Sequence, residues 1–162
     1  MMMLSDVTPP LSLVLVHPQI PPNTGNVARL CAVTGSRLIL IGPLGFSIAS
    51  KDLRRAGLDY WDKVFQTFYP SLDDYLADHA GTRKHLFSSH AEKSFWQTSF
   101  QPGDHLIFGS EQHGLPQEFT DRYAESLTRI PMLPSRRCLN LSTSVGIAAY
   151  EALRQISARE LK

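Results

Sequence analysis

Short apolar runs alternate with helical segments along almost the whole chain, and this alternation constrains the fold more than any other feature. The runs are rich in leucine and β-branched residues and cover residues 12–16, 37–41, 64–68, 84–88, 105–108 and 126–130. Runs such as LVLV and LILI are apolar at every position, which is typical of strands buried on both faces. Strands that alternate with helices predict an α/β fold, with a mostly parallel sheet and helices on both faces.

Helices are expected between these runs. Asn23 or Thr24 is a suitable N-cap for a helix that continues to about Thr34, where Gly35 ends it. We also expect helices at 52–58 and 71–80 and near residue 116, whereas residues 90–101 are ambiguous. The last helix carries apolar side chains at three- and four-residue steps, a stripe that suits packing on the sheet: Leu141, Val145, Ala148, Ala149, Ala152, Leu153 and Ile156.

Length and composition favour a single folded domain, 1–162, whose first residues, 1–11, form a flexible tail. No apolar run approaches the ~20 residues that span a bilayer, and the start MMMLSDVTPP does not resemble a signal peptide. We therefore expect a cytoplasmic protein without membrane contact.

Cys31 and Cys138 are far apart in sequence, which favours free thiols. The net charge of +1 means that any basic binding surface must be local.

Residues 130–144, IPMLPSRRCLNLSTS, carry more polar and special residues than a simple connector needs. Ligands of parallel sheets bind beyond the carboxyl ends of strands, which selects three loops, 18–26, 109–116 and 131–140. Gly109 and Gly114 allow close approach of the backbone to a flat ligand, and Ile130, Met132 and Leu133 offer apolar walls. Such a pocket suits an adenosine-like group. The alternative is a pair of glycine turns at the edge of the core.

Other chemistries are less well supported. Arg29 lies one to two turns into the first helix, where its guanidinium either binds an anion or packs over neighbouring side chains. Cys138 lacks a neighbouring base for nucleophilic catalysis. The six histidines show no metal-ligand spacing, so no metal is predicted. Neither a dinucleotide fingerprint, nor a phosphate-binding P-loop, nor a complete G-x-S-x-G serine elbow is present.

Read together, the loops resemble the motifs of the SPOUT-class RNA ribose 2'-O-methyltransferases. The first is PPNTGN with Arg29, the second is FGSE with GLP, and the third is IPM followed by NLS. With RRAGLDYW at residues 54–61, the chain is most similar to the short bacterial tRNA (cytidine(34)-2'-O)-methyltransferase family. The resemblance extends from about residue 13 to residue 155.

The resemblance implies a C-terminal trefoil knot, an S-adenosyl-L-methionine site, a homodimer and methylation of the wobble ribose of tRNA. The alternatives are ribose methylation of another RNA, such as rRNA, or a non-catalytic RNA-binding protein of the same fold. By motif, Arg29, Asn23 and Asn140 would be catalytic. The cofactor would contact Ser89, Gly109, Glu111, Gly114, Ile130, Met132, Cys138 and Leu139. RNA would contact Arg54, Arg55, Arg137 and Ser142.

Three further points concern Arg29, Cys138 and a short segment. A guanidinium has a pKa above ~12, so we expect Arg29 to hold a phosphate and stabilise the developing alkoxide rather than to remove a proton. Cys138 stands where the family usually has serine. Residues 90–93, HAEK, stand near where relatives often have a threonine-rich turn.

Overall fold

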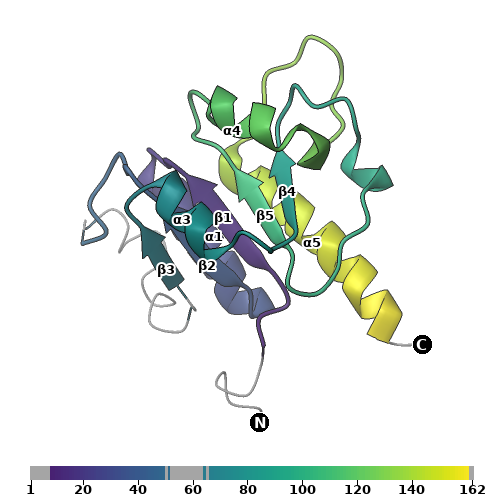
Figure 1. Cartoon of the computed structure of the whole chain (residues 1–162), viewed down its shortest axis with the longest axis horizontal. Coiled ribbons are helices and arrows are strands. Elements are labelled where there is room, and N and C mark those ends of the chain that lie inside the picture. Colours follow the sequence, from purple (N-terminus) through teal and green to yellow (C-terminus); the bar gives the residue numbers. More distant parts are fainter. Residues whose placement is uncertain (1–7, 50, 52–63, 65, 161–162) are drawn as a thin grey trace.

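The computed structural model describes residues 8–49, 51, 64 and 66–160, and it confirms an α/β fold built on a parallel sheet (Figure 1). The strands are β1 (Ser12–Val16), β2 (Arg37–Ile41), β3 (Gln66–Tyr69), β4 (Lys84–Phe87), β5 (His105–Phe108) and β6 (Leu127–Thr128). They lie in the order β3-β2-β1-β5-β4-β6, and every pair is parallel. The strand order therefore changes direction between β1 and β5.

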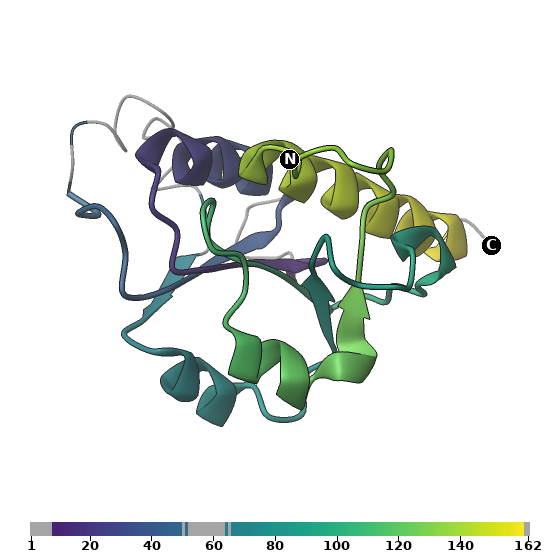
Figure 2. The ribbon, with the colours of Figure 1, turned by 90° about the horizontal axis from the view of Figure 1, so that it is seen from above.

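Helices cover both faces of this sheet, as predicted. Figure 2 shows α1 (Pro21–Thr34) and α5 (Leu141–Glu160) side by side on one face, with α3 (Leu72–Asp78) and α4 (Gln117–Arg122) on the other. Two short 3-10 turns, η3 (Phe95–Gln97) and η4 (Ala124–Ser126), lie in the connections to β5 and β6.

The core is divided by the sheet into two clusters. Leu13 and Leu15 of β1 face α1 and α5, whereas Val14 and Val16 face α3 and α4. This alternation follows from the two-residue period of a strand. It explains why β1 and β2 are apolar at almost every position: both faces are covered.

The start of α1 differs from the prediction. The helix begins at Pro21 rather than after Asn23 or Thr24, and its N-cap, Ile20, makes no side-chain hydrogen bond. Proline suits the first helical positions because its missing N–H would have no partner there. The predicted end is correct, since Gly35 has φ 71° and terminates the helix.

The strand prediction at 126–130 was too long because the chain leaves β6 after Thr128. Arg129 instead pairs with the preceding connection: its N–H donates to Lys93 O over 2.9 Å, and its carbonyl accepts from Phe95 N over 2.8 Å. The ambiguous residues 90–101 are this connection, which contains η3. The predicted helix at 52–58 lies outside the described residues.

The chain after β6 returns across the sheet to α5, which packs against α1. A knotted path for this segment stays a prediction. Within the described residues, no helix is both long enough and apolar enough to cross a membrane.

Candidate functional site

The loops that follow β1 and β5 separate at the centre of the sheet. The two strands are neighbours, with Leu15 paired to Phe108. The chain after β1 enters α1 on one face, whereas the chain after β5 leads to α4 on the other (Figure 2). Ligands of open α/β sheets bind where neighbouring connections diverge in this way. The candidate site therefore lies beyond the carboxyl ends of β1 and β5.

Glu111 joins these two loops. Its Oε2 accepts a hydrogen bond from Gln19 N over 2.8 Å, and its Oε1 accepts from Ile20 N over 3.0 Å. Oε1 also accepts from Asn23 Nδ2 over 3.3 Å. Prolines occupy the first two positions of α1, so the backbone N–H groups that need an acceptor lie just before the helix. A carboxylate is favourable at this positively polarised end.

Asn140 joins the third loop to the same cluster. Its Nδ2 donates to Asn23 Oδ1 over 3.1 Å. Its Oδ1 accepts from Thr143 N over 3.2 Å and from the Ser142 hydroxyl over 2.7 Å, which caps the start of α5. Glu111, Asn23 and Asn140 thus form one hydrogen-bonded chain through the three loops that the sequence selected.

The orientations of both amide groups follow from their partners. The backbone N–H of Thr143 only donates, so the oxygen of Asn140 must face it and its NH2 group must face Asn23. The Glu111 carboxylate accepts, so the NH2 group of Asn23 faces it. Asn23 binds the second and third loops, and Asn140 binds the first loop and the start of α5, which holds the loops in one arrangement.

Gly109 follows β5 and allows the loop to fold tightly. A Cβ at this position would lie 2.0 Å from the carbonyl carbon of Gly114 and 2.2 Å from Leu115 N. Ser110 and Gly114 are held together by two backbone hydrogen bonds of 3.2 and 3.0 Å. Gly114 itself has φ 66°, a conformation that favours glycine. Both glycines are therefore required by the backbone.

Four of the other predicted cofactor residues are described by burial and by one contact. Ile130 and Met132 are half-buried, and Ile130 packs on the core cluster below α5. Cys138 Sγ lies 3.4 Å from the Ser89 hydroxyl, to which it donates, so the third loop also contacts the end of β4. The structure therefore brings Ser89 and Cys138 into contact, whereas Ile130 packs on the core.

The other predicted site residues differ in their surroundings. The predicted catalytic residue Arg29 is exposed on α1. Residues 133–140 are exposed throughout, and they include the predicted cofactor residue Leu139 and the predicted RNA contact Arg137. Ser142 is committed to Asn140, as described above. Arg54 and Arg55 lie outside the described residues.

The role of Glu111 was not foreseen. The sequence suggested a cofactor contact, but both carboxylate oxygens bind the start of α1. The consecutive prolines at 21 and 22 were the available signal, because they move the unpaired N–H groups to Gln19 and Ile20.

The structure also buries the Thr24 hydroxyl without a hydrogen-bond partner in the described chain. Among the described residues, no cluster of three or more His, Cys, Asp or Glu side chains is arranged to hold a metal ion.

Comparison with known proteins identifies the family. The model of the SpoU rRNA Methylase family matches residues 10–150. The chain belongs to this family. Its SpoU relatives include proteins named tRNA (cytidine(34)-2'-O)-methyltransferase from Escherichia coli (strain K12) and Methylovorus glucosotrophus (strain SIP3-4). Both are 44% identical, over 90% and 88% of this chain and 94% of each relative.

Solved structures agree with this assignment. One, described as giving structural insights into the 2-OH methylation of C/U34 on tRNA, is 46% identical. It superposes with a TM-score of 0.87 and covers 91% of this chain and 97% of that one. An AdoMet-bound rRNA methyltransferase from Sinorhizobium meliloti has a TM-score of 0.79 at 26% identity, covering 93% of this chain and 59% of that one.

Proposed function

We propose that the chain transfers a methyl group from S-adenosylmethionine to the ribose 2'-hydroxyl of nucleotide 34, a cytidine or modified uridine, in tRNA. The observation that carries the proposal is the hydrogen-bonded chain from Glu111 through Asn23 to Asn140. It assembles the three motif loops at the divergence point of the sheet. The relatives that are named for this reaction align along almost the entire chain.

The residues at this edge suit S-adenosylmethionine. The close-packed turn at Gly109 presents backbone, and Ile130 and Met132 present apolar side chains that are only half-buried. Pockets that combine apolar walls with a few backbone hydrogen-bonding groups are typical for adenosine. When bound, the cofactor would supply a methyl group on a positively charged sulfur: the 2'-oxygen gains the methyl as the carbon–sulfur bond breaks, the sulfur leaves as a neutral thioether, and the hydroxyl proton passes to solvent.

The protein's contribution is mainly orientation and charge. Holding two reacting groups in line can account for ~7–11 kcal/mol of a barrier. Asn23 and Asn140 maintain the loop arrangement in which this alignment takes place. Arg29, exposed on α1, carries a permanent positive charge that can hold the neighbouring phosphate and stabilise the alkoxide as the hydroxyl loses its proton.

We assign RNA contacts to the exposed third loop and to the RRAGLDYW motif at residues 54–61. Arg137 extends from the exposed residues 133–140, where it can bind phosphate. Ser142, Arg54 and Arg55 complete the proposed RNA surface. The enzyme would act in the cytoplasm, on tRNA.

A homodimer is also proposed, because apolar side chains remain exposed on the layer formed by α1 and α5. Val33 is 67% exposed on α1, and Ile147 and Tyr150 are 40% and 55% exposed on α5. Ile147 and Tyr150 are three residues apart, so they lie on one outer face of the helix. An Ile147→Asp variant is expected to be monomeric in analytical ultracentrifugation, and a variant that remained dimeric would exclude this face.

Methyl transfer from labelled S-adenosylmethionine to unmodified tRNA tests the function, with the modified nucleotide mapped by nuclease digestion. Arg29→Ala is expected to abolish transfer with an unchanged circular dichroism spectrum. Arg122→Ala, a change to an exposed arginine on α4, is the matched control and should remain active. A protein that binds cofactor but labels no tRNA would contradict the proposal.

Methylation of rRNA is the second candidate, since the family model carries that description. The same labelling assay on ribosomal RNA distinguishes the two substrates. Sequence identity favours tRNA as the substrate. The chain is 44% identical to the tRNA methyltransferase relatives and 26% identical to the rRNA methyltransferase of known structure.

A further inference from the structure

An exposed tryptophan lies on the β6 edge of the sheet. Trp96 in η3 is 70% exposed. The turn that carries it lies at the edge of the molecule, beside the C-terminal half of α5 (Figures 1 and 2). An indole has a large apolar surface, and exposed tryptophans are enriched where proteins contact a partner.

The turn holds Trp96 rigidly. Phe95 is buried beneath it, packs edge-on against Phe87 and stacks with Trp96 at a centroid distance of 6.1 Å. The Ser94 hydroxyl accepts from Trp96 N over 3.2 Å, and Phe95 N donates to Arg129 O over 2.8 Å. The indole is therefore presented outward from a fixed support, and little conformational entropy would be lost on contact with a ligand.

A polar hollow is lined by residues that flank this turn, although not by Trp96 itself. Its volume is about 450 Å³, within the ~300–1,000 Å³ range of ligand sites. Lys93 and Thr98, on either side of η3 in sequence, both line it. The lining contains three lysine or arginine residues and one carboxylate, together with five serine or threonine residues: Arg83, Lys84, Lys93, Glu125, Thr82, Thr98, Ser99, Ser126 and Thr128.

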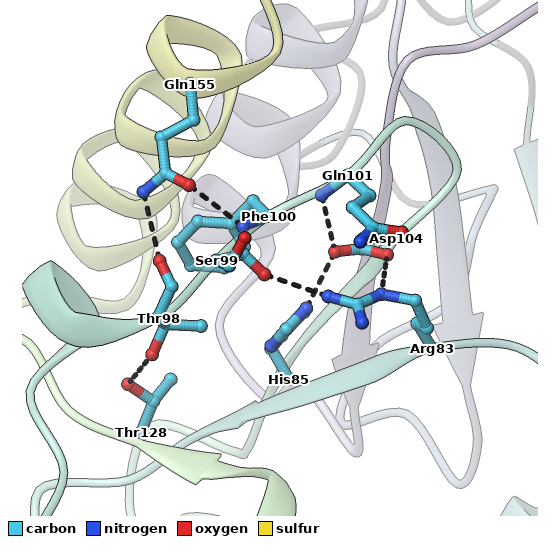
Figure 3. Close-up of polar contacts among 9 residues, drawn as sticks. All are labelled: Arg83, His85, Thr98, Ser99, Phe100, Gln101, Asp104, Thr128 and Gln155. Atoms are coloured by element: carbon cyan, nitrogen blue, oxygen red, sulfur yellow. Dashed lines mark hydrogen bonds and ion pairs between the residues drawn. The ribbon is translucent and has the colours of Figure 1, made fainter.

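A buried network fixes the wall of the hollow (Figure 3). Asp104, which is 1% exposed, accepts from Arg83 Nε over 2.9 Å and is bonded to His85 Nε2 over 2.7 Å. Its own pKa is lowered by these two partners, in spite of its burial, so the carboxylate stays ionised. The Thr98 and Thr128 hydroxyls bond to each other over 3.1 Å.

The cations of the hollow differ in their availability. Lys84 Nζ is committed to the carbonyls of His79 and Thr82, and Arg83 is paired with Asp104. Lys93 is exposed, and its ammonium group makes no hydrogen bond or ion pair within the described residues. Lys93 is therefore the side chain that can bind an incoming anion without breaking an existing contact.

From these features we propose that Trp96 and the adjoining hollow form a second RNA subsite, in which a base of the tRNA stacks on the indole and a backbone phosphate binds Lys93. Proteins hold unpaired RNA by stacking bases on aromatic side chains and by binding the backbone with cations, because every base has a face that stacks. Lys93 is three residues from Trp96, so one nucleotide segment can contact both. The inference rests on the proposed function, since it makes the same tRNA the ligand.

The subsite is within reach of the reaction. Ser89, which contacts the third motif loop, and Trp96 belong to one connection and are seven residues apart. Seven residues span at most ~25 Å, which is shorter than an RNA stem-loop. Nucleotides that flank the target can contact Trp96 while nucleotide 34 occupies the motif loops.

Equilibrium binding of unmodified tRNA to the full-length protein tests the proposal. Trp96→Ala is expected to weaken binding by about tenfold, with Trp96→Phe close to wild type because a ring is retained. Lys93→Ala should weaken binding and lower the slope of log K against log salt by about 0.7. Phe68→Ala is the matched control, because Phe68 is 46% exposed on β3 at the opposite edge.

Two further measurements distinguish stacking from indirect effects. Bound tRNA should quench the tryptophan fluorescence of wild type more strongly than that of Trp96→Phe. Affinity for S-adenosylmethionine, measured by calorimetry, should be equal in all variants. If Trp96→Ala bound tRNA as tightly as wild type, and wild type methylated tRNA normally, the subsite would be wrong but the proposed function would stand. Dissociation of a dimer as the only effect of Trp96→Ala would also overturn the subsite. Failure of wild type to bind any tRNA would overturn both the subsite and the proposed function.

Discussion

The side-chain NH2 group of Asn140 donates a hydrogen bond to the side-chain oxygen of Asn23 over 3.1 Å, across 117 positions of sequence. The same two residues are each bound at their other end, to the start of α5 and to Glu111. A change at either asparagine therefore affects two helices and three loops. This makes the pair a suitable place to separate stability from activity.

Asn140→Asp is expected to lower methyl transfer at least about tenfold with little change in stability. An aspartate retains the oxygen that caps α5, but its second oxygen would face the oxygen of Asn23. Rotation of the Asn23 amide would relieve this only by placing its oxygen against Glu111. Asn140→Ser, which keeps a cap and removes the link, should behave similarly. Transfer kinetics and urea denaturation are the measurements, and wild-type activity in both variants would contradict the role of the link.

Glu111→Gln is expected to lower the free energy of unfolding by about 1–3 kcal/mol, because the ionised acceptor of three N–H groups becomes neutral. The glutamine side chain would also place an NH2 group where one carboxylate oxygen had been, facing an N–H donor. Glu118→Gln is the control, since Glu118 is exposed on α4 and such changes usually stay within about 0.5 kcal/mol. Urea midpoints of the two variants give the comparison. Equal midpoints would mean that Glu111 does not stabilise the loops.

Much of this fold could be predicted because local pattern and burial agree. The runs at β1, β2 and β5 are apolar on both faces, and the sheet covers both faces with helices. The last helix was predicted by its stripe, which lies on the core. Gly35 was recognised because a left-handed helix end favours glycine.

What could not be predicted depends on contacts between distant residues. The start of α1 was misplaced because its cap is Glu111, some ninety residues away, and not a neighbouring side chain. Lys93 and Phe95 pair with Arg129, so neither the end of β6 nor the connection around Trp96 has a local signal. The structure brings the three motif loops together, but the pattern of hydrogen bonds that joins them was not visible in the motifs.

Stability is expected to fall in mildly acid solution because of His105. Burial, with the neighbouring His79, lowers the pKa of His105 to about 4, from 6.5 when unfolded. Between these values the unfolded chain binds the additional proton, so the free energy of unfolding falls by about 3 kcal/mol as pH decreases from 6.5 to 4. The lowered pKa of Asp104 acts in the same direction at lower pH, below its ordinary value of 3.8.

Urea denaturation at several pH values measures this dependence. His105→Gln removes the titrating group, so its free energy of unfolding should change less between pH 6.5 and 4 than that of wild type. It should also be less stable at pH 7, because the 2.8 Å hydrogen bond between His105 and the Tyr75 hydroxyl is lost. An identical pH dependence in the two proteins would show that His105 is not the group responsible.

Gly109→Ala is expected to destabilise the protein by about 2–4 kcal/mol and to prevent cofactor binding. The new methyl group would lie 2.0 Å from the backbone of Gly114, which cannot move without breaking the Ser110–Gly114 pairing. Gly81→Ala is the matched control, because Gly81 is exposed, has nothing within 4 Å of the added Cβ and does not have a left-handed backbone. Thermal denaturation and calorimetry with S-adenosylmethionine distinguish the two variants. If Gly109→Ala bound the cofactor as tightly as Gly81→Ala, the tight turn after β5 would not be part of the cofactor site.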